Sequence, residues 1–152
     1  MSLLRLRHGL WLAVCDGKRA LLLQNSGDQV YPKLETREAF KQDDPPTHEQ
    51  GSSPPGRVFA SGNRRAATEE SDFHQQRIEH FLGMVAKDLN HRVSQGEIEA
   101  LALVAPAPAL GVLRTRLSDQ ARRAVVAEID RDYTKMPIYE IERHLSQGNA
   151  SH

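Results

Sequence analysis

Two apolar runs of strand length open the chain, at residues 10–15 and 19–25. Asp16 and Gly17 stand between them, and an Asp-Gly pair between two apolar runs is a strong signal for a tight hairpin turn. Because such a turn reverses the chain at once, the two strands must pair antiparallel. The pattern therefore predicts a β-hairpin near the N-terminus.

A second turn, at residues 25–28, leads from the hairpin into a third segment, 30–40. The alternation in this segment predicts a strand with four side chains on one face, namely Leu34, Thr36, Glu38 and Phe40. Pro32 cannot donate a backbone hydrogen bond, so the strand either starts late or lies at an edge of the sheet. We expect a three-stranded antiparallel meander.

Residues 78–93 carry apolar side chains at spacings of three, four and seven residues, which is the period of an amphipathic helix. The apolar positions are Ile78, Phe81, Leu82, Val85, Leu89 and Val93. We expect this helix to begin with Ser71 or Asp72 as its cap and to end at Gly96. Its apolar face is suited to packing on the sheet.

Residues 98–105 form a continuous apolar run. A strand covered on both faces has this pattern, and such strands are usually central and parallel. Pro106 and Pro108 end the run, and residues 109–117 predict a short helix.

The C-terminal residues are less uniform in pattern. Residues 123–129 suit a helix or a strand equally, and this alternative stays open on periodicity alone. A last helix follows Pro137, with Gly148 beyond its end, and its apolar stripe consists of Ile138, Ile141 and Leu145.

A polar segment at residues 43–56, rich in Pro, Gly and Ser, separates these two halves. It has no apolar side chain to bury, so we expect it to be mobile. With 152 residues, the chain is expected to form a single domain over 1–152.

Charge and cysteine content narrow the function classes. Twenty basic and 20 acidic side chains balance, which argues against a surface that attracts nucleic acid or membrane all over, although a local patch remains open. Cys15 is the single cysteine, so no internal disulfide can form, and we expect it to be a buried apolar residue. The apolar run that ends at Cys15 is too short for a signal peptide, and no run is long enough to span a membrane. We expect a cytoplasmic protein.

Recognisable catalytic motifs are absent from the sequence. The seven histidines show no metal-binding spacing, and no nucleophile elbow, phosphate-binding loop or dinucleotide fingerprint occurs. We expect no cofactor, and the lack of these motifs favours a protein that is not an enzyme. The densest basic stretch consists of Arg114, Arg116, Arg122 and Arg123, which form either a solvated face or a contact with a phosphate backbone.

Several segments together resemble the host-attachment protein family of bacteria. They are residues 12–20, 56–62, 103–106 leading into 110–114, and 132–134. That family is similar to the middle domain of peptide-chain release factors, so the resemblance implies a ribonuclease H-like α/β fold. A mixed five-stranded sheet would then hold three antiparallel strands, followed by helix, strand, helix, strand and helix, with residues 123–129 as the fifth strand.

In a ribonuclease H-like sheet, the first, fourth and fifth strands run parallel, so their carboxyl ends meet at one edge. Open α/β sheets place their sites at such an edge. The resemblance therefore implies a candidate site made of Asp16, Gly111, Arg114, Asp130, Asp132 and Thr134, with the amides that open the helix after Pro108 favouring an anion. The alternative is structural: Asp16 as a turn residue, Thr134 as a helix cap, and Asp132 as a partner of neighbouring amides.

Two function classes follow from these observations. The first is a non-catalytic binding module, linked through the resemblance to translation or ribosome stress, with the ribosome, RNA or a protein as partner and any role in host-cell attachment indirect. The Gly-Gly-Gln tripeptide of release factors is absent, so peptide release by that route is not expected. The second is a metal-dependent nuclease. Against it, Asp130 and Asp132 are expected about 10 Å from Asp16, two strand spacings away.

Overall fold

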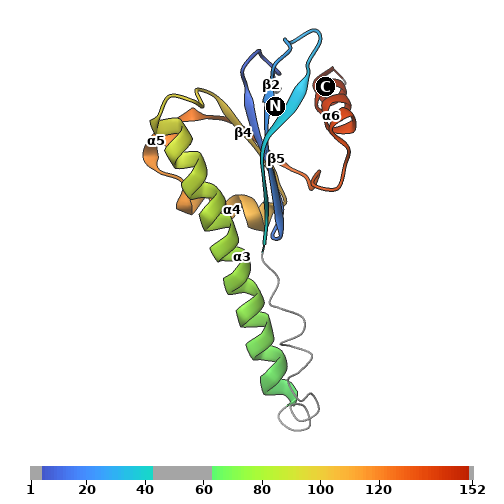
Figure 1. Ribbon diagram of the computed structural model, residues 1–152. Coiled ribbons are helices and arrows are strands. Elements are labelled where there is room, and N and C mark those ends of the chain that lie inside the picture. Colours follow the sequence, from blue (N-terminus) through green and yellow to red (C-terminus); the bar gives the residue numbers. More distant parts are fainter. Residues whose placement is uncertain (1–4, 43–62, 151–152) are drawn as a thin grey trace.

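A mixed five-stranded sheet forms the centre of the computed structural model, which describes residues 5–42 and 63–150 (Figure 1). The segment 43–56, for which we expect mobility, lies outside the described residues. The strand order is β3-β2-β1-β4-β5, and the strands are β1 (Trp11–Cys15), β2 (Arg19–Asn25), β3 (Leu34–Lys41), β4 (Leu101–Ala105) and β5 (Val125–Asp130).

The directions of the strands confirm the predicted α/β sheet. β1 pairs antiparallel with β2, and β2 pairs antiparallel with β3, which completes the meander. β4 lies between β1 and β5 and runs parallel to both, as its continuous apolar sequence indicates. The carboxyl ends of β1, β4 and β5 therefore meet at one edge, which is the arrangement of a ribonuclease H-like sheet.

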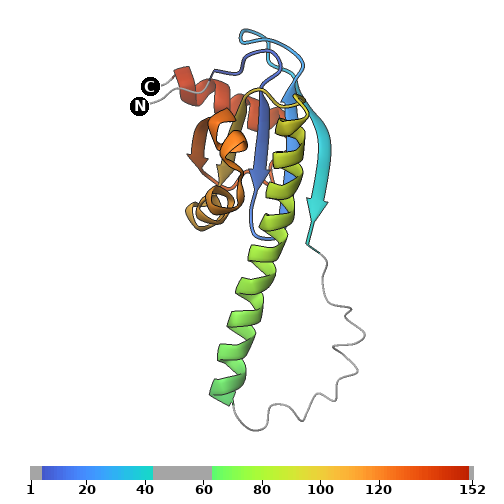
Figure 2. The same ribbon diagram turned by 90° about the vertical axis from the view of Figure 1, so that its left-hand side faces the viewer.

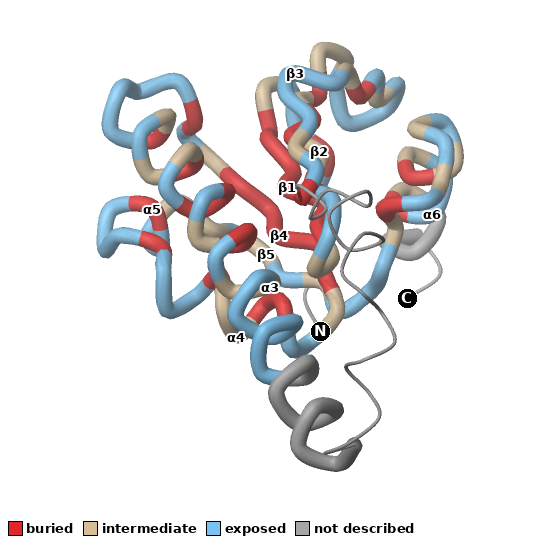
Figure 3. The backbone as a smooth tube through the Cα atoms, turned by 60° about the horizontal axis from the view of Figure 1, so that its bottom comes forward, coloured by how far each residue is buried: buried red, intermediate tan, exposed pale blue. Residues whose placement is uncertain are grey.

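Helices cover both faces of the sheet and enclose two apolar cores. One face carries α3 (Asn63–Ser94), α4 (Ala107–Arg116) and α5 (Asp119–Ala124), whereas α6 (Ile138–Ala150) packs on the other. Figures 1 and 2 show α6 on the opposite side of the sheet from α3 and α4. Figure 3 shows that the buried residues concentrate in the strands and on the inner sides of the helices. Because both faces are covered, β1 and β4 are buried along their whole length.

β3 departs from its predicted pattern. It begins at Leu34 and lies at the edge of the sheet, which agrees with both expectations drawn from Pro32. The expectation of one shared face is wrong, since Leu34 packs in the core under α6 and Phe40 packs in the core under α3. The register shifts opposite Leu22 and Leu23, and such a bulge moves all later side chains to the other face.

α3 is longer than its apolar pattern predicts. It begins at Asn63, so Ser71 and Asp72 lie inside the helix and neither is its cap. The first part of α3 runs beyond the body of the sheet (Figures 1 and 2), where a helix needs no apolar stripe and leaves no periodic signal. The C-terminal end agrees with prediction, because Gly96 adopts a φ of 81° just after the last helical residue.

The C-terminal elements follow the expected order with three changes. α4 begins at Ala107, two residues early, because prolines are tolerated in the first turn of a helix. The ambiguous stretch splits into both structures, with the short helix α5 capped by Ser118, followed directly by β5. α6 continues through Gly148 to Ala150, so that glycine does not end the helix.

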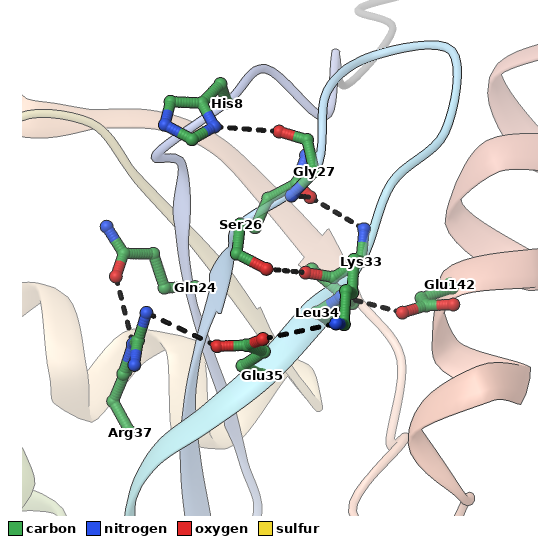
Figure 4. Close-up of polar contacts among 10 residues, drawn as sticks. His8, Gln24, Ser26, Gly27, Lys33, Leu34, Glu35, Arg37 and Glu142 are labelled. Atoms are coloured by element: carbon green, nitrogen blue, oxygen red, sulfur yellow. Dashed lines mark hydrogen bonds and ion pairs between the residues drawn. The ribbon is translucent and has the colours of Figure 1, made fainter.

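Asn25 fixes the turn between β2 and β3. Its fully buried side chain donates to the carbonyls of Leu6 (2.6 Å) and Arg7 (3.1 Å) and accepts from the amides of Gly27 (2.9 Å) and Lys33 (2.8 Å). Figure 4 shows further contacts around this turn, among them His8 to the Gly27 carbonyl (2.9 Å), and the Leu34 amide donating to Glu142 of α6 (2.7 Å). These bonds join the N-terminal segment, the turn and α6 into one end of the molecule.

Candidate functional site

Asp16 and Thr134 meet at the carboxyl edge of the sheet, although 118 residues separate them. Asp16 Oδ1 accepts hydrogen bonds from the amides of Lys18 (2.7 Å) and Arg19 (2.8 Å), which closes the β1–β2 turn. The Thr134 hydroxyl lies 2.9 Å from Asp16 Oδ2 and 2.7 Å from Asp132 Oδ1. We call Asp16, Asp132 and Thr134 the edge cluster.

The expected distance of about 10 Å between the carboxylates of Asp16 and Asp132 is wrong. Asp132 and Asp16 both contact one hydroxyl oxygen, so they lie much closer than the 10 Å expected from strand spacing. The reason is that Asp132 belongs to the loop after β5, which returns toward the end of β1, so that counting strands does not apply. Thr134 is not a helix cap, because α6 begins only at Ile138.

Hydrogen bonds largely satisfy the edge cluster from within the chain. The amide of Thr134 donates to Asp132 (3.1 Å), as expected for a carboxylate bonding to neighbouring amides. Partial burial acts to raise the pKa of Asp16, but the bonds from the Lys18 and Arg19 amides and from Thr134 outweigh it and hold this pKa below its usual value. Thr134 is 7% exposed and its hydroxyl has one proton, so it donates to one of the two carboxylates at a time.

The other predicted edge residues do not join this cluster. Asp130 accepts a hydrogen bond from the amide of Ala107 (3.0 Å), so a carboxylate of the chain already occupies the anion position at the start of α4. Arg114 turns to Glu128 on β5, with its Nε and Nη2 atoms 2.8 and 2.6 Å from one carboxylate oxygen. Gly111 lies inside α4, and a Cβ there would meet nothing within 4 Å.

The edge cluster brings two carboxylates together, whereas catalysis with two metal ions draws on several. Within residues 5–42 and 63–150, no group of three or more His, Cys, Asp or Glu side chains could hold a metal ion. The arrangement is that of a structural clamp between the β1–β2 turn and the loop after β5.

Two of the four arginines, Arg114 and Arg122, form ion pairs among the described side chains, and two, Arg116 and Arg123, do not. Arg114 is paired with Glu128, and Arg122 is paired with Asp119 (2.7 Å) while also donating to the Arg114 carbonyl (3.0 Å). These pairs raise the pKa of Arg114 and lower that of Asp119. The ion pairs among the described side chains include neither Arg116 nor Arg123, and both are exposed.

The guanidinium of Arg116 lies against Gly83 of α3, a contact that the residues around Arg116 in the sequence do not predict. Its Nη1 atom is 3.3 Å from where a Cβ of Gly83 would stand, so the missing side chain of this glycine leaves room for the guanidinium. The end of α4 is held beside α3 by Asn90, which donates to the Arg116 carbonyl (3.2 Å) and accepts from the Ser118 amide (2.8 Å). Gly83 and Asn90 thus position the cation, and an interior helix glycine is the one sequence signal that could have suggested this.

Sequence reasoning also missed a polar hub at Arg92. It pairs with three carboxylates, those of Asp88 (2.6 Å), Glu97 (2.8 Å) and Glu38 (3.2 Å), and its guanidinium lies 5.5 Å from the Trp11 ring centroid. The hub therefore joins α3 to the edge strand β3 over a buried aromatic ring.

Cys15 is fully buried in the core under α3, as expected. Burial, together with the neighbouring Asp16 carboxylate, raises the pKa of its thiol to about 12. Such a thiol is protonated at neutral pH and does not act as a nucleophile.

Among the described residues, no helix is sufficiently long and apolar to cross a membrane.

Comparisons with known proteins give a family and distant structural likenesses. No curated protein matches the chain. Among solved structures, an archaeal translation termination factor, aRF1, aligns over 91% of this chain with 9% sequence identity and a TM-score of 0.47, and the chain spans 41% of the length of that factor. The family described as proteins required for attachment to host cells matches residues 11–145, and the chain therefore belongs to that family.

Proposed function

We propose that this domain is a non-catalytic binding module that contacts RNA in the translation machinery, and that its part in host-cell attachment is indirect. The contact surface is the group Arg114, Arg116, Arg122 and Arg123, which we call the arginine surface. The observation that carries the proposal is the position of Arg116: it is exposed, lies outside the ion pairs of the described side chains, and is held in place against α3.

The chemistry of the arginine surface suits a phosphate backbone. An arginine donates two parallel hydrogen bonds to phosphate oxygens. With Arg114 and Arg122 neutralised by Glu128 and Asp119, the binding charge resides chiefly on Arg116 and Arg123. No aromatic residue stands among these arginines in the sequence, so they are expected to bind without base preference.

Titration of a fluorescein-labelled single-stranded RNA with the full chain at increasing KCl tests this proposal. With about two phosphates neutralised by Arg116 and Arg123, the affinity should fall with salt at a log-log slope of about 1.4. Arg116→Glu with Arg123→Glu should abolish binding, because both substitutions place a repulsive charge on the surface. Arg122→Glu is a poorer choice, since it would also break the pair with Asp119 and the bond to the Arg114 carbonyl.

The matched control is Arg143→Gln with Glu140→Gln on α6, which removes one ion pair on the other face of the sheet and leaves the net charge unchanged. It should bind RNA as the unmodified chain does. Co-sedimentation with ribosomal subunits provides the second readout for the link to translation. Absence of RNA binding, or binding that survives the double charge reversal, would overturn the proposal.

The alternative function, a metal-dependent nuclease, gains no support from the site. Asp16 and Asp132 are held by the Thr134 hydroxyl and by backbone amides, and Asp130 caps α4. Metal-dependent cleavage of RNA by the purified chain, abolished in Asp16→Asn, would contradict a non-catalytic role.

A further inference from the structure

An uninterrupted row of exposed side chains runs along α3. Its members follow each other at alternating spacings of four and three residues, so they share one face of the helix, and they are Phe73, Arg77, His80, Met84, Lys87 and His91. We call them the α3 row. It contains two cations, Arg77 and Lys87, two histidines and two apolar side chains, and no carboxylate. From Phe73 to His91 it is about 27 Å long at the rise of an α-helix.

Arg116 extends the α3 row. Gly83, where its guanidinium lies, is three residues after His80 and four before Lys87, so it adjoins both on the helix surface. Two carboxylates of α3 lie near Gly83: Glu79, four residues before it, accepts from Gln75 (3.2 Å), and Asp88 is bound to Arg92 (2.6 Å). The three cations Arg77, Lys87 and Arg116 outnumber them, so the two helices together present a surface of net positive charge.

An aromatic side chain stands at one end of this surface. Phe73 is 60% exposed, and it lies ten residues before Gly83, about 15 Å along the helix axis. Cations interleaved with an exposed aromatic are the combination by which proteins hold a single strand of nucleic acid, since phosphates bind the cations and bases stack on the ring. A duplex, whose bases are already stacked, could use the cations alone.

We propose that single-stranded RNA lies along the α3 row, with its phosphates on Arg77, Lys87 and Arg116 and one base stacked on Phe73. This inference rests on the proposed function and adds the path of the strand and its single-stranded character. A second copy of the chain is disfavoured as the occupant, because two such rows would bring like charges together. A membrane surface is disfavoured too, since Phe73 and Met84 are separated by eleven residues and form no continuous apolar face.

The test measures the anisotropy of a short fluorescein-labelled oligouridylate, and of the same strand annealed to oligoadenylate, with the full chain and its variants. We expect the single strand to bind more tightly than the duplex. Phe73→Ala should weaken binding of the single strand at least fivefold, about the effect of losing one stacked base. Lys87→Glu should weaken both forms and lower the salt slope by about 1.

Matched controls separate local from general effects. Tyr31→Ala removes another exposed aromatic, 79% exposed, from the turn before β3, and Arg143→Glu reverses a charge on α6, on the other face of the sheet. Both should leave the affinity unchanged. If the chain binds RNA and Arg116→Glu weakens it, but Phe73→Ala and Lys87→Glu do not, this inference is overturned and the proposed function stands. If the unmodified chain binds vesicles of anionic lipid and no RNA, both are overturned.

Discussion

The edge cluster and the face formed by α3 and α4 differ in what their polar groups bind. At the edge cluster, Asp16 is held by two backbone amides and the Thr134 hydroxyl, and Asp132 by the same hydroxyl and an amide. On the face formed by α3 and α4, Arg116 and the cations of the α3 row are exposed. Hydrogen bonds within the chain stabilise the fold, whereas exposed charges contribute little to stability and are available to a ligand. The polar residues at the carboxyl edge are therefore bound within the chain, whereas the cations of α3 and α4 are open to a ligand.

The strongest test of this contrast is Asp16→Ala. It removes three hydrogen bonds, one of which joins the β1–β2 turn to the loop after β5. Loss of hydrogen bonds to a charged group should lower the free energy of unfolding by about 2 kcal/mol, with RNA affinity unchanged. Urea unfolding at pH 7 measures the stability.

The matched control for Asp16→Ala is Asp28→Ala. Asp28 also accepts from two amides of its own turn, those of Val30 and Tyr31. It makes no bond comparable to the one with Thr134 among the described contacts, so its loss should cost less. Equal losses in the two variants would show that the Asp16–Thr134 bond contributes nothing.

The pH dependence of stability gives the second test. The pKa of Asp16 is lower in the folded chain than in the unfolded one, so its bonds stabilise the fold fully above the unfolded pKa, near 3.9. That contribution is lost as pH falls through the folded pKa. The stability difference between the unmodified chain and Asp16→Asn should be constant from pH 7 to about pH 5 and should shrink below about pH 4. Urea midpoints measured across this range check it, and a difference that grows with acid would contradict the clamp.

Gly83→Ala should change the free energy of unfolding by less than Asp16→Ala does, and in the opposite direction. Alanine in place of an interior helix glycine raises the free energy of unfolding by about 0.5–1 kcal/mol. The added Cβ would come within 3.3 Å of Arg116 Nη1, so the guanidinium must shift and RNA affinity should fall. The control is Gly111→Ala in α4, where nothing lies within 4 Å of the new Cβ. It should gain similar stability and keep its affinity, and equal affinities in both variants would separate Gly83 from RNA binding.

The smallest effect on stability is expected for Arg116→Ala. An exposed side chain outside the ion pairs of the described residues should change the free energy of unfolding by less than about 0.5 kcal/mol. The salt slope of RNA binding should nevertheless fall by about 0.7, the contribution of one phosphate on a single strand. Thermal unfolding and a salt titration measure the two. A marked loss of stability would mean that Arg116, like Asp16, serves the fold.

The hairpin and the buried strand could be predicted because their signals are local. The Asp16–Gly17 turn between two apolar runs specifies β1 and β2, and the unbroken run that ends at Ala105 indicates a covered strand. α3 was predicted only where it packs on the sheet, since an exposed helix carries no apolar stripe. The stretch from α5 into β5 stayed ambiguous because apolar residues at 121, 125 and 129 suit a helix, whereas the β-branched Val125, Val126 and Ile129 favour a strand.

By itself the sequence determined the class of the fold, the parallel position of β4 and the residues at the carboxyl edge, since these follow from periodicity, turn chemistry and the resemblance. Only the tertiary structure decided what those residues contact. The bulge in β3 reverses the face of Phe40, the loop after β5 brings Asp132 to Asp16, and the packing of α4 lays Arg116 on Gly83. Each of these contacts joins groups far apart in the chain. How whole elements pack decides which groups meet, and local sequence patterns do not predict that packing.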